Sequence, residues 1–161
     1  MRRLPKKRRI ENKTNYLKRK RMLESGKPRI IIRKSNKYII IQYVESKIAQ
    51  DSVKKAISSN ELLEYGWPKE KIGSLKSIPA AYLTGLLFGK SIKDLKPAVF
   101  DLGLARSTKG SRIYAALKGL VDAGFDIPHG KEIFPEEKRI QNENVKDFFE
   151  KVKIKIMGAK S

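Results

Sequence analysis

The loop from Gly103 to Arg112 has the composition of a phosphate-binding site. Its ten residues include three cations, three hydroxyl side chains and two glycines. Apolar residues at helical spacing begin directly after Ser111, so the loop leads into the N-terminus of a predicted helix. Unpaired backbone N–H groups and the helix dipole attract anions at such a position. We therefore expect this loop to bind a phosphate, which belongs either to a nucleotide or to a polymer.

Two nucleotide-binding patterns fit this segment poorly. A P-loop needs its lysine after the last glycine, whereas Lys109 precedes Gly110. Residues 99–103 (VFDLG) resemble the first phosphate motif of the actin and sugar-kinase ATPases, but those enzymes need a second lobe with a matching phosphate loop. A chain of 161 residues is too short for that lobe. Asp101 is therefore predicted to be a structural residue at the end of a strand.

A nuclease that uses two metal ions needs several carboxylates at one site. The candidates are scattered over different segments: Asp51, Asp94, Asp101, Asp122 and Asp126. The sequence does not indicate that any two of them meet. An RNA-processing nuclease therefore stays as the alternative function.

Other chemistry is limited by two residue types. The absence of cysteine excludes disulfides, zinc ribbons, iron–sulfur ligation and thiol nucleophiles. His129 is the only histidine and lies in a turn-like Ile-Pro-His-Gly segment. We expect no metal, no cofactor and no small-molecule substrate.

Positive charge is concentrated at the N-terminus. The formal net charge is +20, and the first 28 residues contain twelve cations and two acids. A lysine-rich surface can simply solvate a protein or reflect a hot habitat. Clustering in one arm, at one predicted hairpin and in one loop instead favours a surface that follows phosphates. We expect the arm to become ordered when it binds a polyanion.

Three aromatic residues lie close in sequence to these cations. Tyr16, Tyr38 and Trp67 are candidates for stacking on unpaired RNA bases. For Trp67 we favour a place at the edge of the core, because the only tryptophan of a domain usually packs there.

The strands that would carry these residues are predicted from apolar runs. Isoleucine-rich segments at 29–34 and 37–44 flank Ser35-Asn36, which indicates a hairpin whose two faces are both covered. A weaker strand is predicted near 51–58 and a compact buried one at 97–102. The latter is expected to be parallel to a neighbour.

The predicted helices follow from caps and periodicity. One begins after Ser77 and ends near Gly89, and a second runs from Ser111 to Gly124. Small residues at spacing four in the first helix indicate close approach of a neighbouring backbone, either a sheet or RNA, and we favour packing in the core. Short helical turns are predicted at 16–23 and 61–66. An amphipathic helix at 145–156 is expected to dock on the domain.

These elements predict an α/β fold with a mixed sheet, in which an antiparallel hairpin or meander and one parallel strand are packed by helices. The expected division is a basic arm at 1–27, a core domain at 28–133 and a docked C-terminal helical segment at 134–161. The longest apolar region, 78–88, is shorter than the roughly twenty residues of a membrane span. We expect a soluble, cytoplasmic protein without a signal peptide or a membrane partner.

Several ordered motifs then resemble one known family. They are KTNY at 13–16, SGKPR at 25–29, SNKY at 35–38, PAAYLTG at 79–85, KGSRIYAALKG at 109–119, DAG at 122–124 and IPH at 127–129. Together they resemble the large ribosomal subunit protein eighteen family in its archaeal form. The resemblance extends from about Asn12 to the C-terminal helix.

The resemblance implies a fold similar to the ribonuclease H-like sheet without its catalytic acids. It also implies that the chain binds 5S ribosomal RNA and helps seat it on the large-subunit ribosomal RNA in the central protuberance, beside other large-subunit proteins. Arm, hairpin and loop would contact RNA through these residues: Arg2, Arg3, Lys6, Lys7, Arg8, Arg9, Lys13, Thr14, Tyr16, Arg19, Arg21, Arg33, Lys34, Lys37, Arg106, Ser107, Thr108, Lys109, Ser111 and Arg112.

Overall fold

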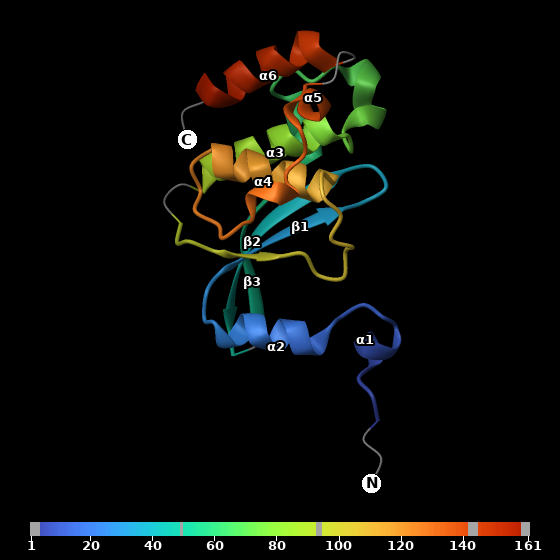
Figure 1. The fold of residues 1–161 in the computed structure, drawn as a ribbon, viewed down its shortest axis with the longest axis vertical. Coiled ribbons are helices and arrows are strands. Elements are labelled where there is room, and N and C mark those ends of the chain that lie inside the picture. Colours follow the sequence, from blue (N-terminus) through green and yellow to red (C-terminus); the bar gives the residue numbers. More distant parts are fainter. Residues whose placement is uncertain (1–3, 49, 93–94, 142–144, 159–161) are drawn as a thin grey trace.

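The computed structural model describes residues 4–48, 50–92, 95–141 and 145–158. Its centre is a four-stranded sheet with the strand order β3-β2-β1-β4 (Figure 1). The strands are β1 (Arg29–Lys34), β2 (Ile39–Lys47), β3 (Gln50–Ser58) and β4 (Val99–Asp101). All four strands coincide with segments predicted from the sequence, although β2 begins two residues later and continues three residues further than expected.

The pairing confirms the predicted mixed sheet. β1 and β2 form an antiparallel hairpin in which Ile32 pairs with Ile41, and β3 pairs antiparallel with β2. β4 is parallel to β1, with Asp101 opposite Ile31. The parallel pairing follows because the chain crosses over through a helix between β3 and β4. The ribonuclease H-like likeness itself stays a prediction.

Helices form layers on both sides of this sheet. The longer ones are α2 (Tyr16–Glu24), α3 (Ile78–Ser91), α4 (Arg112–Asp122) and α6 (Lys146–Gly158). The short ones are α1 (Lys7–Ile10), α5 (Glu137–Ile140), η1 (Ser59–Leu63), η2 (Lys69–Ser74) and η3 (Lys131–Ile133). In Figure 1, α3 and α4 cover one face, α6 lies beyond them, and α2 lies on the opposite side. None of the described helices is long and apolar enough to cross a membrane.

Glycines let α3 and α4 pack with their backbones in contact. A Cβ atom on Gly85 would lie 2.0 Å from the Ala116 carbonyl oxygen, and one on Gly119 would lie 2.1 Å from the Tyr82 carbonyl oxygen. The small residues of α3 therefore face a neighbouring helix. This contact confirms that the small residues pack in the core. The neighbouring backbone is that of a helix, so the predicted sheet or RNA neighbour is wrong.

The C-terminal segment packs on this helical layer. Phe149, Val152 and Ile156 of α6 are buried, as the amphipathic pattern predicts. Trp67 is only 2% exposed and meets the ring of Phe148 edge-on, with centroids 4.9 Å apart. Trp67 is thus part of the core, as favoured, and the alternative that it stacks on an RNA base is wrong.

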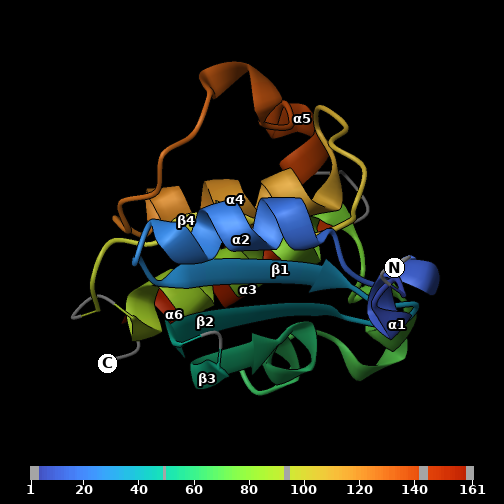
Figure 2. The same ribbon diagram turned by 90° about the horizontal axis from the view of Figure 1, so that it is seen from below.

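The N-terminal helix α2 differs from its expected behaviour. Its charge predicts that it becomes ordered only with a polyanion, but it forms a capped helix whose Asn15 side chain accepts a hydrogen bond from the Lys18 amide. Figure 2 shows α2 running alongside β1. The Asp51 carboxylate of β3 binds Arg19 of α2 and supplies negative charge that sequence reasoning sought only in an external partner.

Candidate nucleic-acid interface

The two faces of β1 differ because side chains alternate along a strand. Ile30 and Ile32 point toward α3 and α4 and are fully buried. Arg29, Ile31 and Arg33 point to the other face, where α2 lies. This alternation separates an apolar face from a charged one.

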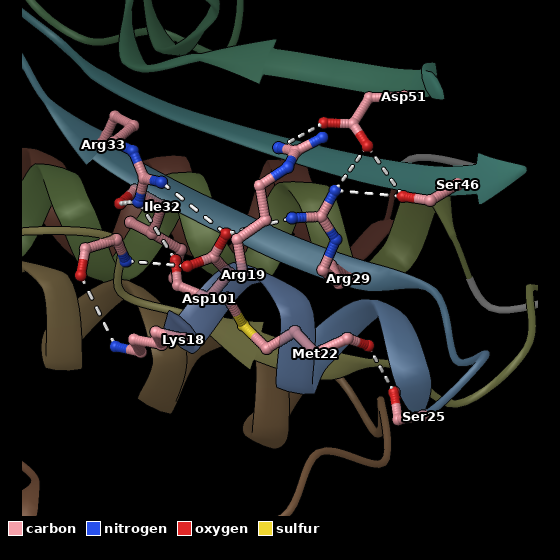
Figure 3. A network of polar contacts seen from close by, with 11 residues as sticks. Lys18, Arg19, Met22, Ser25, Arg29, Ile32, Arg33, Ser46, Asp51 and Asp101 are labelled. Atoms are coloured by element: carbon pink, nitrogen blue, oxygen red, sulfur yellow. Dashed lines mark hydrogen bonds and ion pairs between the residues drawn. The ribbon is translucent and has the colours of Figure 1, made fainter. Parts of the chain in front are cut away.

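Arg29 is the centre of the charged face. It is 2% exposed, and its two terminal nitrogens bind two carboxylates that come from different strands (Figure 3). Nη2 lies 2.7 Å from Asp51 Oδ1, and Nη1 lies 3.4 Å from Asp101 Oδ2. Ser46 Oγ accepts a further hydrogen bond from Nη2 at 3.0 Å. A guanidinium with this degree of burial is tolerated because its charge is balanced.

Asp51 also ties α2 to the sheet. Its second oxygen, Oδ2, lies 2.9 Å from Nη1 of Arg19 on α2. Burial by itself raises the pKa of Asp51, but hydrogen bonds from Ser46 and Arg19 and the charge of Arg29 outweigh it and hold the pKa below its usual value. The carboxylate is therefore ionised at neutral pH and anchors the helix.

Arg33 has a different environment from Arg29. Its Nη1 donates hydrogen bonds to the carbonyl oxygens of Ile32 and Asp101, at 3.2 and 3.0 Å. Nη2 lies 3.8 Å from Asp101 Oδ2. The side chain is nevertheless 43% exposed, so a fixed guanidinium faces solvent.

A hollow of about 330 Å³ lies between α2, the preceding arm and the loop after β4, and we call it the arm hollow. Ile31, Met22 and Asp101 are among its walls. Its cations are Arg8, Lys13, Lys18, Arg19, Arg29 and Arg33. Such an excess of positive charge in a concave site is suited to phosphate.

A second hollow, of about 380 Å³, lies at the N-terminus of α4, and we call it the loop hollow. Its cations are Lys34, Arg106, Arg112 and Arg139. Gly110 adopts a positive φ of 67° in this loop, and the Ser107 and Tyr114 hydroxyls lie 2.6 Å apart. The Lys109 Nζ atom lies 3.4 Å from Glu132 Oε2. The loop predicted from composition is thus a basic concave surface.

The structure divides the cations that the sequence groups at the hairpin. Lys34 and Lys37 are exposed near the turn, as expected. The sequence places Arg33 with them, but strand alternation turns it to the opposite face and into the arm hollow. The hairpin therefore contributes to two hollows.

The predicted arm residues that the structure describes belong to α1, α2 and the segments that flank α1. Arg2 and Arg3 lie outside the described residues. Lys7, Arg8 and Arg9 belong to α1 and are exposed, and Arg21 is exposed on α2. Arg8 Nε donates to Thr14 Oγ1 at 2.9 Å, Lys13 pairs with Glu11 at 2.8 Å, and Lys6 Nζ lies 4.4 Å from the centre of the Tyr16 ring.

Two members of this surface are missed by sequence reasoning. Lys18 lines the arm hollow, and its Nζ lies 3.5 Å from the Gly103 carbonyl oxygen. Arg29 belongs to a run that reads as an apolar strand. The period of two along β1, which places Arg29 and Arg33 on one face, is the available signal.

The candidate carboxylates that the structure describes are separated or bound to cations and hydroxyl groups. Asp51 and Asp101 both bind Arg29, which lies between them. Asp122 accepts a hydrogen bond from Tyr82 on the helical side, and Asp94 lies outside the described residues. Within the part of the chain that the structure describes, no three acidic or histidine side chains are placed to hold a metal ion.

Comparison with known proteins places the chain in a family. The family model described as "Ribosomal large subunit proteins 60S L5, and 50S L18" matches residues 2–98 and 92–130. Large ribosomal subunit protein uL18 of Korarchaeum cryptofilum is 48% identical over 147 residues, which cover 90% of this chain and 73% of the relative. The protein of the same name from Methanothrix thermoacetophila is 43% identical over 166 residues, which cover 97% and 96%. The chain therefore belongs to the family of ribosomal large-subunit proteins 60S L5 and 50S L18.

Proposed function

We propose that this protein is a structural constituent of the large ribosomal subunit, in which it binds 5S ribosomal RNA and helps attach it to the large-subunit ribosomal RNA in the central protuberance. Family membership supports the ribosomal role. The observation that carries the RNA-binding role is the pair of basic hollows on either side of the loop after β4. Neighbouring large-subunit proteins are the other expected partners.

The proposed mechanism is adhesion without turnover. Phosphate contacts from the arm (1–27), the hairpin and the loop position the RNA, and the rigid domain recognises its folded shape. Release of counterions from the RNA supplies much of the binding free energy, since the protein carries a formal net charge of +20. The apolar layer of α3 and α4 keeps these groups at fixed separations.

Crosslinking to total RNA, followed by sequencing of the trapped molecules, tests the partner. We expect 5S ribosomal RNA and one region of the large-subunit RNA to be enriched over their abundance. Equal recovery of all RNAs would contradict the proposal, because adhesion through charge alone has no preference for one folded RNA. A competition titration with unrelated structured RNA of equal length serves as the quantitative control.

Removing residues 1–14 tests the arm. This deletion keeps α2 and its Arg19–Asp51 ion pair, so the domain should retain its melting temperature. Affinity for 5S ribosomal RNA should fall. The slope of log K against log salt should become less steep by roughly 0.7 to 0.9 for each phosphate that the shortened chain no longer binds. An unchanged slope would remove residues 1–14 from the interface.

Charge reversal at Lys109 and Arg112 tests the loop from Gly103 to Arg112, of which Arg112 lines the loop hollow. The matched control is the reversal of Lys146 and Lys151, two exposed lysines on α6 to which we assign no RNA contact. We expect the loop variant to lose affinity much more than the control at equal net charge. Equal losses would indicate that only total charge matters.

Incubating the protein with labelled 5S ribosomal RNA and Mg²⁺ tests the nuclease alternative. We expect the RNA to stay intact. Cleavage that disappears in Asp101→Asn would replace the adhesive role by a catalytic one.

A further inference from the structure

The turn after β4 is built around the carboxylate of Asp101. Its Oδ1 accepts a hydrogen bond from the Gly103 amide at 2.7 Å, and its Oδ2 lies near both arginines of the charged face. The carboxylate is 7% exposed. Asp101 therefore joins the loop to β1, although the two segments are distant in sequence.

Gly103 leaves the space that Arg33 occupies. It has a positive φ of 61°, and a Cβ atom there would lie 2.5 Å from Arg33 Nη2 and 2.8 Å from Cζ. The guanidinium thus lies directly over the Gly103 Cα. Any larger residue at this position would displace it.

Several groups of the protein fix the Arg33 side chain, and part of its surface is exposed to solvent. The two carbonyl oxygens that accept from Nη1 and the Asp101 carboxylate fix the plane of the guanidinium (Figure 3). Lys18 reaches the same turn from α2 through the Gly103 carbonyl oxygen. The entropy cost of ordering a long side chain on binding is reduced when it is already fixed.

The remaining walls supply further cations and a hydroxyl. Arg8 and Lys13 come from the arm, and the Thr14 hydroxyl holds Arg8 from the same segment. Among the described residues, the only carboxylate that lines the arm hollow is Asp101. Since Asp101 already binds Arg29 and Arg33, it orders the site instead of opposing an anion.

We propose that the arm hollow is a preformed subsite for one backbone phosphodiester of the bound RNA, in which Arg33 and Lys18 contact the phosphate and Asp101 and Gly103 are positioning residues for Arg33. This inference rests on the proposed function, which it deepens by assigning a ligand group to one part of the interface. An arginine fork held in this way matches two phosphate oxygens.

The sign of the Asp101→Asn effect tests the proposal. Coulomb attraction alone predicts tighter RNA binding, because the change removes a negative charge from a phosphate site. Positioning predicts the opposite, a roughly tenfold loss of affinity. The slope of log K against log salt, called the salt slope, should also become less steep by about 0.7 to 0.9, which corresponds to one phosphate. Asp126→Asn is the matched control, since Asp126 is exposed beyond the far end of α4. An affinity gain or an unchanged slope in Asp101→Asn overturns the proposal.

A double-mutant cycle separates positioning from stability, because Asp101→Asn also disturbs Arg29. Gly103→Ala should lower the salt slope as much as Arg33→Ala does, and it should have no further effect in the Arg33→Ala background. Arg33→Lys keeps the charge and should still lose affinity, because lysine lacks the fork. Additive losses from Gly103→Ala and Arg33→Ala would overturn the proposal.

Salt slopes are measured on 5S ribosomal RNA and on an unrelated RNA duplex. The subsite recognises a phosphate, so Arg33→Ala should lower the slope on both. If the unmodified protein bound the two RNAs with equal affinity, the proposed function would be contradicted but the phosphate subsite would not. Unchanged slopes in the variants contradict the subsite alone.

Discussion

The two faces of the sheet are stabilised in different ways. On one face, Ile30 and Ile32 pack under α3 and α4 without charge. On the other, which lies under the basic helix α2, Arg29 binds two carboxylates and Arg33 lies near one of them. The apolar face depends on close steric fit, whereas the charged face depends on balanced charges. The residues proposed to bind RNA at the arm hollow therefore lie on the charged face, where Arg33 is 43% exposed.

This contrast indicates that stability and RNA affinity can be changed separately. A change at the contact of α3 and α4 should act on folding alone, because the residues buried in that contact lie outside both basic hollows except Ile113. A change at Arg33 should act on binding. Arg29 lies between these cases, since it lines the arm hollow but is buried.

The largest expected effect is on the apolar face. Gly119→Ala puts a methyl group into the Tyr82 backbone, which cannot move away without separating α3 from α4. We expect the free energy of unfolding to fall by about 3 kcal/mol or more, as for severe overpacking. Urea unfolding followed by circular dichroism measures it. Gly130→Ala is the control, because no atom lies within 4 Å of a Cβ there; similar stability of the two variants would contradict the close fit.

The next effect is on the charged face. Arg29→Met leaves the Asp51 and Asp101 carboxylates without the cation between them. Breaking a buried ion pair on one side costs about 3 kcal/mol, and we expect a loss of that order in urea unfolding. Lys27→Met makes the same charge change at an exposed position and should cost little. If adding Asp101→Asn restored none of the stability, unbalanced carboxylates would not be the cause.

A smaller effect is expected from one polar contact of the helical layer. The Tyr82 hydroxyl donates to Asp122 Oδ2 at 2.9 Å, and burial followed by this hydrogen bond raises the pKa of Tyr82. Tyr82→Phe should lower the free energy of unfolding by about 1 kcal/mol and leave the RNA salt slope unchanged. Tyr65→Phe is the control, since no described residue hydrogen-bonds the Tyr65 hydroxyl. A changed slope would show that the two faces are coupled.

The smallest effect is the acid sensitivity of the charged face. Because the pKa of Asp51 is below its ordinary 3.8 in the folded protein, its contribution to stability is complete above that value and is lost as the pH falls through the lower, folded pKa. Melting temperatures measured at decreasing pH should therefore drop less steeply in Asp51→Asn than in the unmodified protein. Parallel curves would mean that Asp51 does not link α2 to the sheet.

Much of the fold is predictable from local patterns. The Ile-rich runs predict β1 and β2, Ser77 predicts the start of α3, and the alternation of strands and helices predicts a mixed sheet. Each of these depends on residues that are neighbours in the chain. The candidate site is predictable only as clusters of cations, because charge density does not reveal which face a side chain occupies.

Composition and short-range periodicity by themselves determined a mixed α/β domain with a strongly basic surface suited to a polyanion. Strand alternation already predicts that Arg33 and Lys34 lie on opposite faces of β1. Tertiary structure alone decided that Arg29 is buried, which hollow each of the other two lines, and that α2 lies on the charged face. The physical reason is that the residues that interact are distant in the sequence: Arg29 and Asp101 are 72 positions apart. Such a pair meets only when parallel pairing of β4 with β1 brings the two segments together.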